Sequence, residues 1–156
     1  MTIGTASGAK LFIGSANADP DTLLATYQAD SYIEVGEIED LGEFGDESTD
    51  VTFDSLSRGR TRHLKGTRNA GTMPLTVGDD MTDEGQTAME AAEATPLDYN
   101  FKVELNNAVT IGGTNSQHYF IGKVMSKRRR VGTANDVVRR VFSVGINSPI
   151  TDVDPT

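Results

Sequence analysis

The chain has 156 residues, a net charge of −9, 37% hydrophobic residues and no cysteine. This length suits one domain that buries about 70% of its unfolded surface, and the lack of cysteine excludes disulfides and thiolate metal ligands. Residues 1–5 lack a signal-peptide pattern, and no apolar stretch approaches the roughly 20 residues of a membrane-spanning helix. We therefore expect a soluble protein made in the cytoplasm, with no membrane partner.

The first third of the chain alternates short apolar runs with polar connections. Strands are predicted at residues 10–14, 32–38 and 51–56, because each is a short run rich in β-branched and aromatic residues. The segment 15–31 carries Asn, Asp, Pro and Ser, and is predicted to be a loop with a helical turn at 22–26.

A long polar segment follows, at residues 57–72. It is rich in Arg, Gly, Thr and Asn and shows no apolar periodicity, which predicts a long basic loop. Loops of this length in a compact domain are usually functional or disordered. The next strand is predicted at 72–77, where Pro74 favours an edge or strand-end position because it has no amide hydrogen.

One helix is predicted with clear start and stop signals. Thr82 or Asp83 can cap it, alanines fill its length, and Thr95 followed by Pro96 ends it. Its narrow, alanine-rich apolar face suits close packing against a sheet.

The rest of the chain is predicted to be β structure ending in an extended C-terminal arm at 147–156. Alternation predicts strands at 99–105, 118–125 and 137–146. The whole chain, 1–156, therefore reads as a single domain of mainly β class. The expected architecture is a β-sandwich or partly open barrel of about seven strands with one flanking α-helix.

Residues of catalytic type do not form a recognisable motif. His63 and His118 belong to no HExxH pair, and neither a G-x-S-x-G turn nor a phosphate-binding glycine loop is present. The spacing of Asp19, Asp21 and Asp30 lacks the glycine and glutamate of an EF-hand loop. We expect no enzymatic activity, no cofactor and no metal.

Charge is strongly segregated along the chain. Residues 1–57 carry a local net charge of −11, whereas residues 58–156 carry +2. Such segregation favours complementary surfaces within or between copies, with a merely solvated surface as the alternative. Nucleic-acid binding by the basic blocks at 58–68 and 127–130 is disfavoured, because no aromatic residues interleave with them.

Four runs, at residues 34–45, 51–60, 65–72 and 142–149, resemble the major tail tube proteins of long-tailed (siphovirus-type) bacteriophages and of related gene transfer agents. The similarity covers about residues 30–150. It implies a β-sandwich with a flanking helix that forms hexameric rings stacked into a tube for DNA ejection. The implied partners are further copies, the tail initiator (distal tail) protein, the tape measure protein, the tail terminator and double-stranded DNA in transit, and the implied location is the virion tail after assembly in the host cytoplasm.

The resemblance also assigns roles to charged residues. The family's long loop contacts the neighbouring ring, and here that loop is 57–72. Outward-facing Asp54 and Glu104 are expected to line the lumen as part of an acidic wall that DNA does not bind. Bases of the loop are expected to meet acids of another copy: Arg58, Arg60, Arg62, Lys65 and Arg68 against Glu37, Glu39, Asp40, Glu43, Asp46 and Glu47.

Three other functions remain open from the sequence. A tail terminator or a secretion-type tube protein would share the ring-forming surfaces, and a terminator would stop at a single ring. A monomeric ligand-binding β-barrel would instead remain a monomer at high concentration.

Overall fold

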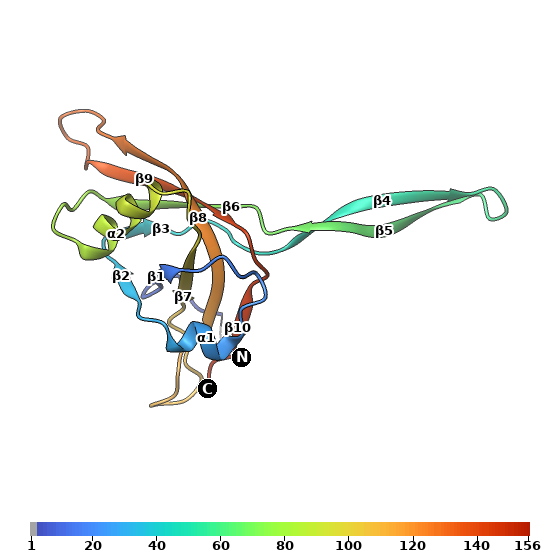
Figure 1. Cartoon of the computed structure of the whole chain (residues 1–156), viewed down its shortest axis with the longest axis horizontal. Coiled ribbons are helices and arrows are strands. Elements are labelled where there is room, and N and C mark those ends of the chain that lie inside the picture. Colours follow the sequence, from blue (N-terminus) through green and yellow to red (C-terminus); the bar gives the residue numbers. More distant parts are fainter. Residues whose placement is uncertain (1–2) are drawn as a thin grey trace.

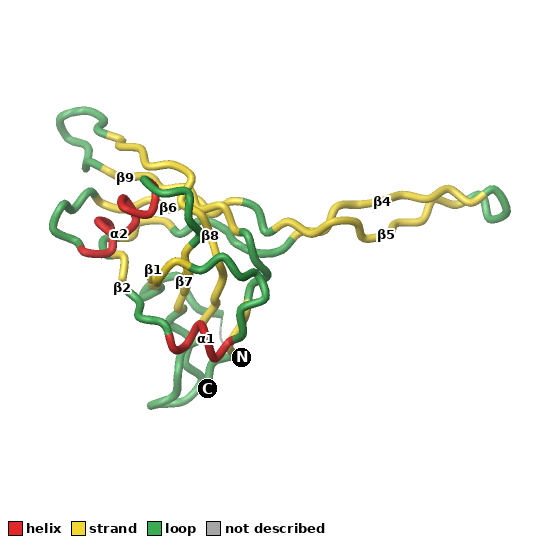
Figure 2. The backbone as a smooth tube through the Cα atoms, viewed as in Figure 1, coloured by secondary structure: helices red, strands yellow, loops and turns green. Residues whose placement is uncertain are grey.

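The computed structural model describes residues 3–156 and confirms a mainly β fold. Within these residues it contains ten strands, more than the seven or so expected, and two short helices. Eight strands form one antiparallel sheet in the order β2-β1-β7-β8-β9-β6-β3, with β10 beside β8. The other two, β4 and β5, form a separate hairpin that projects far from the body (Figures 1 and 2).

The elements follow one another along the chain with these bounds: β1 (Lys10–Ala16), α1 (Leu24–Ala29), β2 (Ile33–Val35), β3 (Ile38–Asp40), β4 (Glu47–Ser55), β5 (Arg60–Asn69), β6 (Thr72–Gly78), α2 (Glu84–Glu93), β7 (Tyr99–Glu104), β8 (Gln117–Arg130), β9 (Arg139–Ile146) and β10 (Thr151–Val153).

The long strand β8 joins two halves of the sheet. Up to Gly122 it pairs with β7, and from Gly122 to Arg130 it pairs with β9. Its register shifts between Val124 and Ser126, and an irregularity of this kind bends a strand. The sheet therefore curves into two layers, β2-β1-β7 with the start of β8, and β3-β6-β9 with its end (Figure 1).

The core fills the space between these two layers. Phe101 of β7 stacks on Phe120 of β8 with ring centroids 5.5 Å apart, and Phe142 of β9 is fully buried in the same cluster. Tyr99, Phe101 and Val103 face inward, as the alternation of 99–105 predicts.

Helix α2 closes one end of this core. The carboxylate of Asp83 accepts a hydrogen bond from Gln86 N at 2.9 Å, which confirms the predicted cap. Gly85 lies so close to β2 that a Cβ there would meet Glu34 O at 2.1 Å. The buried amide of Gln86 donates to Gly36 O and Gly78 O, and so ties the end of β2 to the end of β6.

Helix α1 covers the outer face of the first layer. Tyr27 is buried and stacks on Tyr119 of β8 at 5.5 Å between centroids. The predicted helical turn at 22–26 is therefore a short helix beginning two residues later, at Leu24.

Two strand predictions need correction. Residues 32–38 form two strands rather than one, because Gly36 and the positive φ of Glu37 (58°) turn the chain between β2 and β3. Those two strands lie at opposite ends of the sheet. The strand predicted at 118–125 continues to Arg130, because β9 supplies a pairing partner along the basic run.

The basic segment 57–72 is also not a loop. Residues 60–69 form β5, and the turn before it is only 56–59. Hydrogen bonding to β4 makes this segment extended although neither of its faces is buried. The predicted arm at 147–156 is extended and lies along the domain, because β10 pairs with β8 and Thr156 bonds to residues 109–114.

Candidate functional site

The feature that most distinguishes this molecule is the β4–β5 hairpin. It leaves the body after β3 and returns into β6, so its root is continuous with the second layer (Figure 1). Leu41 and Phe44 anchor that root by packing against the core, and the Phe44 ring lies 6.1 Å from that of Phe120. The hairpin is thus a fixed projection of the domain.

One face of the hairpin carries exposed apolar side chains next to Arg62. The pairs Val51↔Leu64 and Phe53↔Arg62 place their side chains on the same face, because directly paired residues share a face. Val51 is 45% exposed, Phe53 57% and Leu64 55%. An isolated two-stranded hairpin is marginally stable in water, and exposed apolar side chains grouped on one face mark an interaction surface.

The opposite face is polar. Asp50 pairs with Lys65 in the register and its carboxylate lies 2.9 Å from His63 Nδ1. Both partners of this ion pair are more than half exposed, so it adds little to stability. The hairpin therefore presents two chemically different faces.

The basic residues of the hairpin fall into two groups. Arg68, at its root, lies 3.1 Å from Asp46 of the same chain. The hairpin root itself brings these two residues together, and their expected contacts with another copy stay a prediction. Four bases form no ion pair within residues 3–156: Arg58, Arg60, Arg62 and Lys65.

The acids expected to contact another copy also fall into two groups, those with an ion pair within residues 3–156 and those without one. Glu39 pairs with Arg139 of β9 within the chain, and Asp40 accepts a hydrogen bond from Gly42 N at 2.8 Å. The expected contact of Glu39 with another copy likewise stays a prediction. Four of the expected acids have no ion pair within the described part of the chain: Glu37, Asp40, Glu43 and Glu47. Glu43 and Glu47 lie at the hairpin root, whereas Glu37 lies at the other end of β6, where its carbonyl oxygen accepts a hydrogen bond from Gly78 N.

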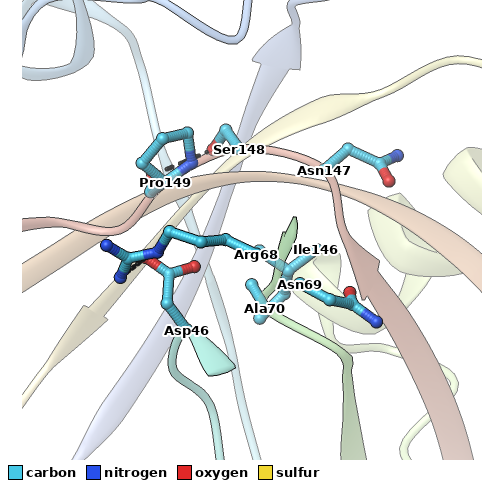
Figure 3. A pocket seen from close by; sticks show the side chains of 8 residues that line it. All are labelled: Asp46, Arg68, Asn69, Ala70, Ile146, Asn147, Ser148 and Pro149. Carbon is cyan, nitrogen blue, oxygen red and sulfur yellow. Dashed lines mark hydrogen bonds and ion pairs between the residues drawn. The ribbon is translucent and has the colours of Figure 1, made fainter. Parts of the chain in front are cut away.

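A groove of about 440 Å³ lies at the hairpin root (Figure 3). The Arg68–Asp46 pair forms one side of it and the segment after β9 forms the other. Its lining mixes charged, polar and small apolar groups, and it holds no histidine. The lining residues are Asp46, Arg68, Asn69, Ala70, Ile146, Asn147, Ser148 and Pro149.

The second layer has one face that neither helix packs against. On β9, Phe142 and Val144 point into the core, so Val141 and Ser143 point away from it. Their direct partners on β8, Arg128 and Ser126, lie on the same outer face. This outer face of β3, β6, β9 and the end of β8 combines small, hydroxyl-bearing and basic residues. Among them are Thr72, Thr76, Ser126, Ser143, Gly78, Gly145, Arg128 and Arg139.

The two residues expected to line a lumen lie on different parts of the molecule. Asp54 is exposed on the projecting hairpin, whereas Glu104 is half-buried at the end of β7 and accepts a hydrogen bond from Asn115. Neither belongs to the outer face of the second layer, so their lumen role stays a prediction. The polar face of β9 and β6 was missed from the sequence, although the alternation of 137–146 could have indicated it.

The two histidines take part in different contacts. His63 pairs with Asp50 on the hairpin, and His118 pairs with Asp152, which ties β10 to β8. Within residues 3–156 no group of three or more acidic, histidine or cysteine side chains is placed to hold a metal ion. In the same residues, neither helix is long and apolar enough to cross a membrane.

Burial and hydrogen bonding together shift the pKa of the Asp30 carboxyl group. Burial of Asp30 opposes its ionisation, but hydrogen bonds from Asn100 and from Ser15 outweigh that effect and hold its pKa below the ordinary value of 3.8. Asp30 thereby links the start of β2 to β1 and β7, a structural role.

Comparison with known proteins identifies solved structures that share this fold. Neither a protein-family model nor a curated protein sequence matches the chain. Among solved structures, it is similar to a chain of the anti-feeding prophage baseplate, with a TM-score of 0.71, 10% identity and coverage of 99% of this chain and 98% of that one. It is also similar to a chain of the sheath/tube terminator of the extracellular contractile injection system PVC, with a TM-score of 0.69, 9% identity and 98% coverage of both.

A third similar structure is the SPP1 tail tube, with a TM-score of 0.59, 14% identity and coverage of 94% of this chain and 76% of that one. At such low identities these likenesses establish the fold, which is of the tail-tube type. Because contractile injection systems and a phage tail share it, the fold does not single out the siphovirus major tail protein that the sequence resembles.

Proposed function

We propose that the chain is a structural protein that assembles into stacked, hexameric rings forming a tail tube. The observation that carries the proposal is the projecting hairpin, whose apolar side chains and four bases have no partner within residues 3–156. A monomer gains nothing from such an element, since a two-stranded ribbon is barely stable alone. A second copy that covers it would bury Val51, Phe53 and Leu64.

The charges at the hairpin support contact between copies. Arg58, Arg60, Arg62 and Lys65 lie on its outer part, while Glu43 and Glu47 lie at its root. Glu37 lies further away, beside Gly78 at the other end of β6. A stack of identical rings brings the outer part of one hairpin toward the root region of the next ring. Heterologous contact of this kind, between two different surfaces of one chain, generates open filaments when it does not close.

The second layer supports the ring. Its four strands, β3, β6, β9 and the end of β8, carry a polar outer face that neither helix covers, whereas helix α2 closes the end of the core. Copies placed side by side around an axis would present this face to a common bore. Double-stranded DNA in transit would then meet hydroxyls, glycines and basic side chains such as Arg128 and Arg139. Contacts of basic side chains with the phosphate backbone carry no sequence information, so passage would not depend on the DNA sequence.

The other partners and the location follow from this role. A tube of this kind grows from a tail initiator, surrounds a tape measure protein and ends at a terminator, in a virion tail assembled in the host cytoplasm. The role needs no catalytic group and no cofactor, so we propose that the chain is not an enzyme.

A single-ring terminator is the second candidate. One of the similar solved structures is a sheath/tube terminator, and another is a tube-terminating cap, with a TM-score of 0.64 and 12% identity. Size-exclusion chromatography with light scattering over a concentration series distinguishes the two functions. A tube protein gives a mass that keeps growing with concentration, a terminator stops at one ring, and a persistent monomer contradicts both.

A further inference from the structure

An exposed methionine contacts two arginines in the turn between β6 and α2. Met81 is 69% exposed, yet its Sδ atom lies 3.1 Å from Nη2 of Arg140 and 3.7 Å from Nη2 of Arg129. Both guanidinium groups donate a hydrogen bond to the sulfur. Met81 thus contacts two cationic side chains while much of its own surface stays open to small molecules in solution.

The nearer of these two arginines is buried. Arg140 on β9 is only 3% exposed; Asp79 accepts a hydrogen bond from its Nη2 at 2.6 Å, and Glu90 accepts one from its Nη1 at 3.3 Å. Its Nε atom is also buried and has no hydrogen-bond partner within residues 3–156. A buried cation needs good hydrogen-bond acceptors, whereas a thioether sulfur is a weak one. The Arg140 guanidinium group is therefore short of strong acceptors.

Arg129 joins the same network from the neighbouring strand. It is paired directly with Arg140 in the register of β8 and β9, and its Nε donates to Asp79 at 3.2 Å. Like charges placed directly opposite each other in a sheet destabilise it. The carboxylate of Asp79 contacts both arginines, so a second strong acceptor at the position of the Met81 sulfur would contact two cations at once.

Oxidation of the sulfur would supply that acceptor. When hydrogen peroxide reacts with a thioether, a lone pair of the sulfur forms the S–O bond and the O–O bond of the peroxide breaks. The departing hydroxide takes the proton from the transferred oxygen and leaves as water, so the sulfur is oxidised and the peroxide is reduced. The product is a polar sulfoxide. Its oxygen can accept hydrogen bonds from guanidinium groups, and hydrogen bonds with a charged donor are stronger than those between neutral groups.

We propose that Met81 is a site of oxidation to the sulfoxide, and that Arg129 and Arg140 bind the sulfoxide oxygen. Methionine oxidation commonly disrupts a fold, because it places a polar group among apolar ones. Here the sulfur already faces two guanidinium groups, so oxidation stabilises the turn against the end of β8 and the start of β9. The inference goes beyond the proposed function, since it concerns the monomer whether or not the chain forms a tube.

The other methionines within residues 3–156 provide internal controls. Met125 on β8 is 60% exposed, almost as much as Met81, but within these residues only the Met81 sulfur accepts hydrogen bonds. Met73 and Met89 are fully buried and should stay unoxidised while the chain is folded. A comparison of Met81 with Met125 therefore separates the effect of the two arginines from that of exposure alone.

Peroxide treatment followed by urea unfolding tests the proposal, with the chain kept below the concentration at which it pellets. In the Met125→Leu variant, fragment-ion mass spectrometry is expected to locate the added oxygen at Met81. Oxidation of this variant is expected to make the equilibrium constant for unfolding about three- to tenfold smaller. The Met81→Leu variant, in which Met125 is oxidised instead, is expected to show no such gain. Adding Arg129→Gln to Met125→Leu removes one donor and is expected to reduce the gain.

Three results would overturn the proposal. The first is an oxidised Met125→Leu chain that unfolds as readily as the untreated one, or more readily. The second is a Met81 that stays unoxidised when Met125 of the wild type is fully oxidised. The third is a gain of equal size in the Met81→Leu variant, which would exclude the two arginines as its cause. Failure of the chain to form tubes would leave all of these measurements unchanged, so this proposal and the proposed function fail separately.

Discussion

Replacing Phe53 by alanine should impair assembly without destabilising the monomer. An aromatic side chain buries roughly 150–250 Å² when fully covered, and the residue is 57% exposed on the hairpin. About 110 Å² is thus left for a neighbour to cover. At about 25 cal/mol per Å² this is worth about 2–3 kcal/mol per copy, or roughly a 30- to 150-fold higher concentration for assembly.

We expect this change to have little effect on the free energy of unfolding of the monomer. Substitutions at exposed positions usually alter the free energy of unfolding by no more than about 0.5 kcal/mol. The matched control is Thr52→Ala, on the opposite face of the same strand. Pelleting across a dilution series measures assembly, and urea unfolding measures the monomer. The reasoning is refuted if Phe53→Ala assembles at the wild-type concentration while Thr52→Ala does not, or if Phe53→Ala unfolds several kcal/mol more easily.

Three further predictions concern the hairpin, helix α2 and the Asp30 network. Arg60→Glu with Arg62→Glu should block tube growth in electron micrographs while circular dichroism stays native; unimpaired tubes would exclude the hairpin charges from the contact. Gln86→Ala should lower the free energy of unfolding by about 2–4 kcal/mol, because it empties a fully buried side-chain position and removes the donors to the part-buried Gly36 O and Gly78 O; urea unfolding showing less than about 0.5 kcal/mol would refute that link. The lowered pKa of Asp30 means that its contribution is present above pH 3.8 and lost as pH falls below it; urea unfolding at pH 7 and pH 3 should show a larger acid loss for wild type than for Asp30→Asn, and equal losses would contradict it.

Much of the sheet and the helix could be predicted because one face of each is buried. The alternation at 99–105 identified Phe101 and Val103 as core residues, and Asp83 marked the start of α2. In these segments a single physical requirement, burial of apolar side chains on one face, fixes both the local structure and its orientation. The sequence signal and the fold therefore agree.

The hairpin could not be predicted in the same way. Along β5 both faces are exposed, so Arg60, Arg62 and His63 leave no apolar period that would reveal a strand. The same holds at the end of β8, where a basic run conceals extended structure. Some charged residues pair within the chain, as Arg68 does with Asp46. Which residues pair in this way depends on the segments that the fold brings together, and the sequence alone does not show which segments these are.

Electron microscopy of the purified chain at high concentration and low salt tests the central claim most directly. The account predicts hollow filaments with a regular axial repeat, which shorten as salt screens the contacts between rings. Single rings that never stack would favour the terminator. Monomers throughout, even after addition of preformed tail ends as seeds, would contradict assembly of this chain into a tube.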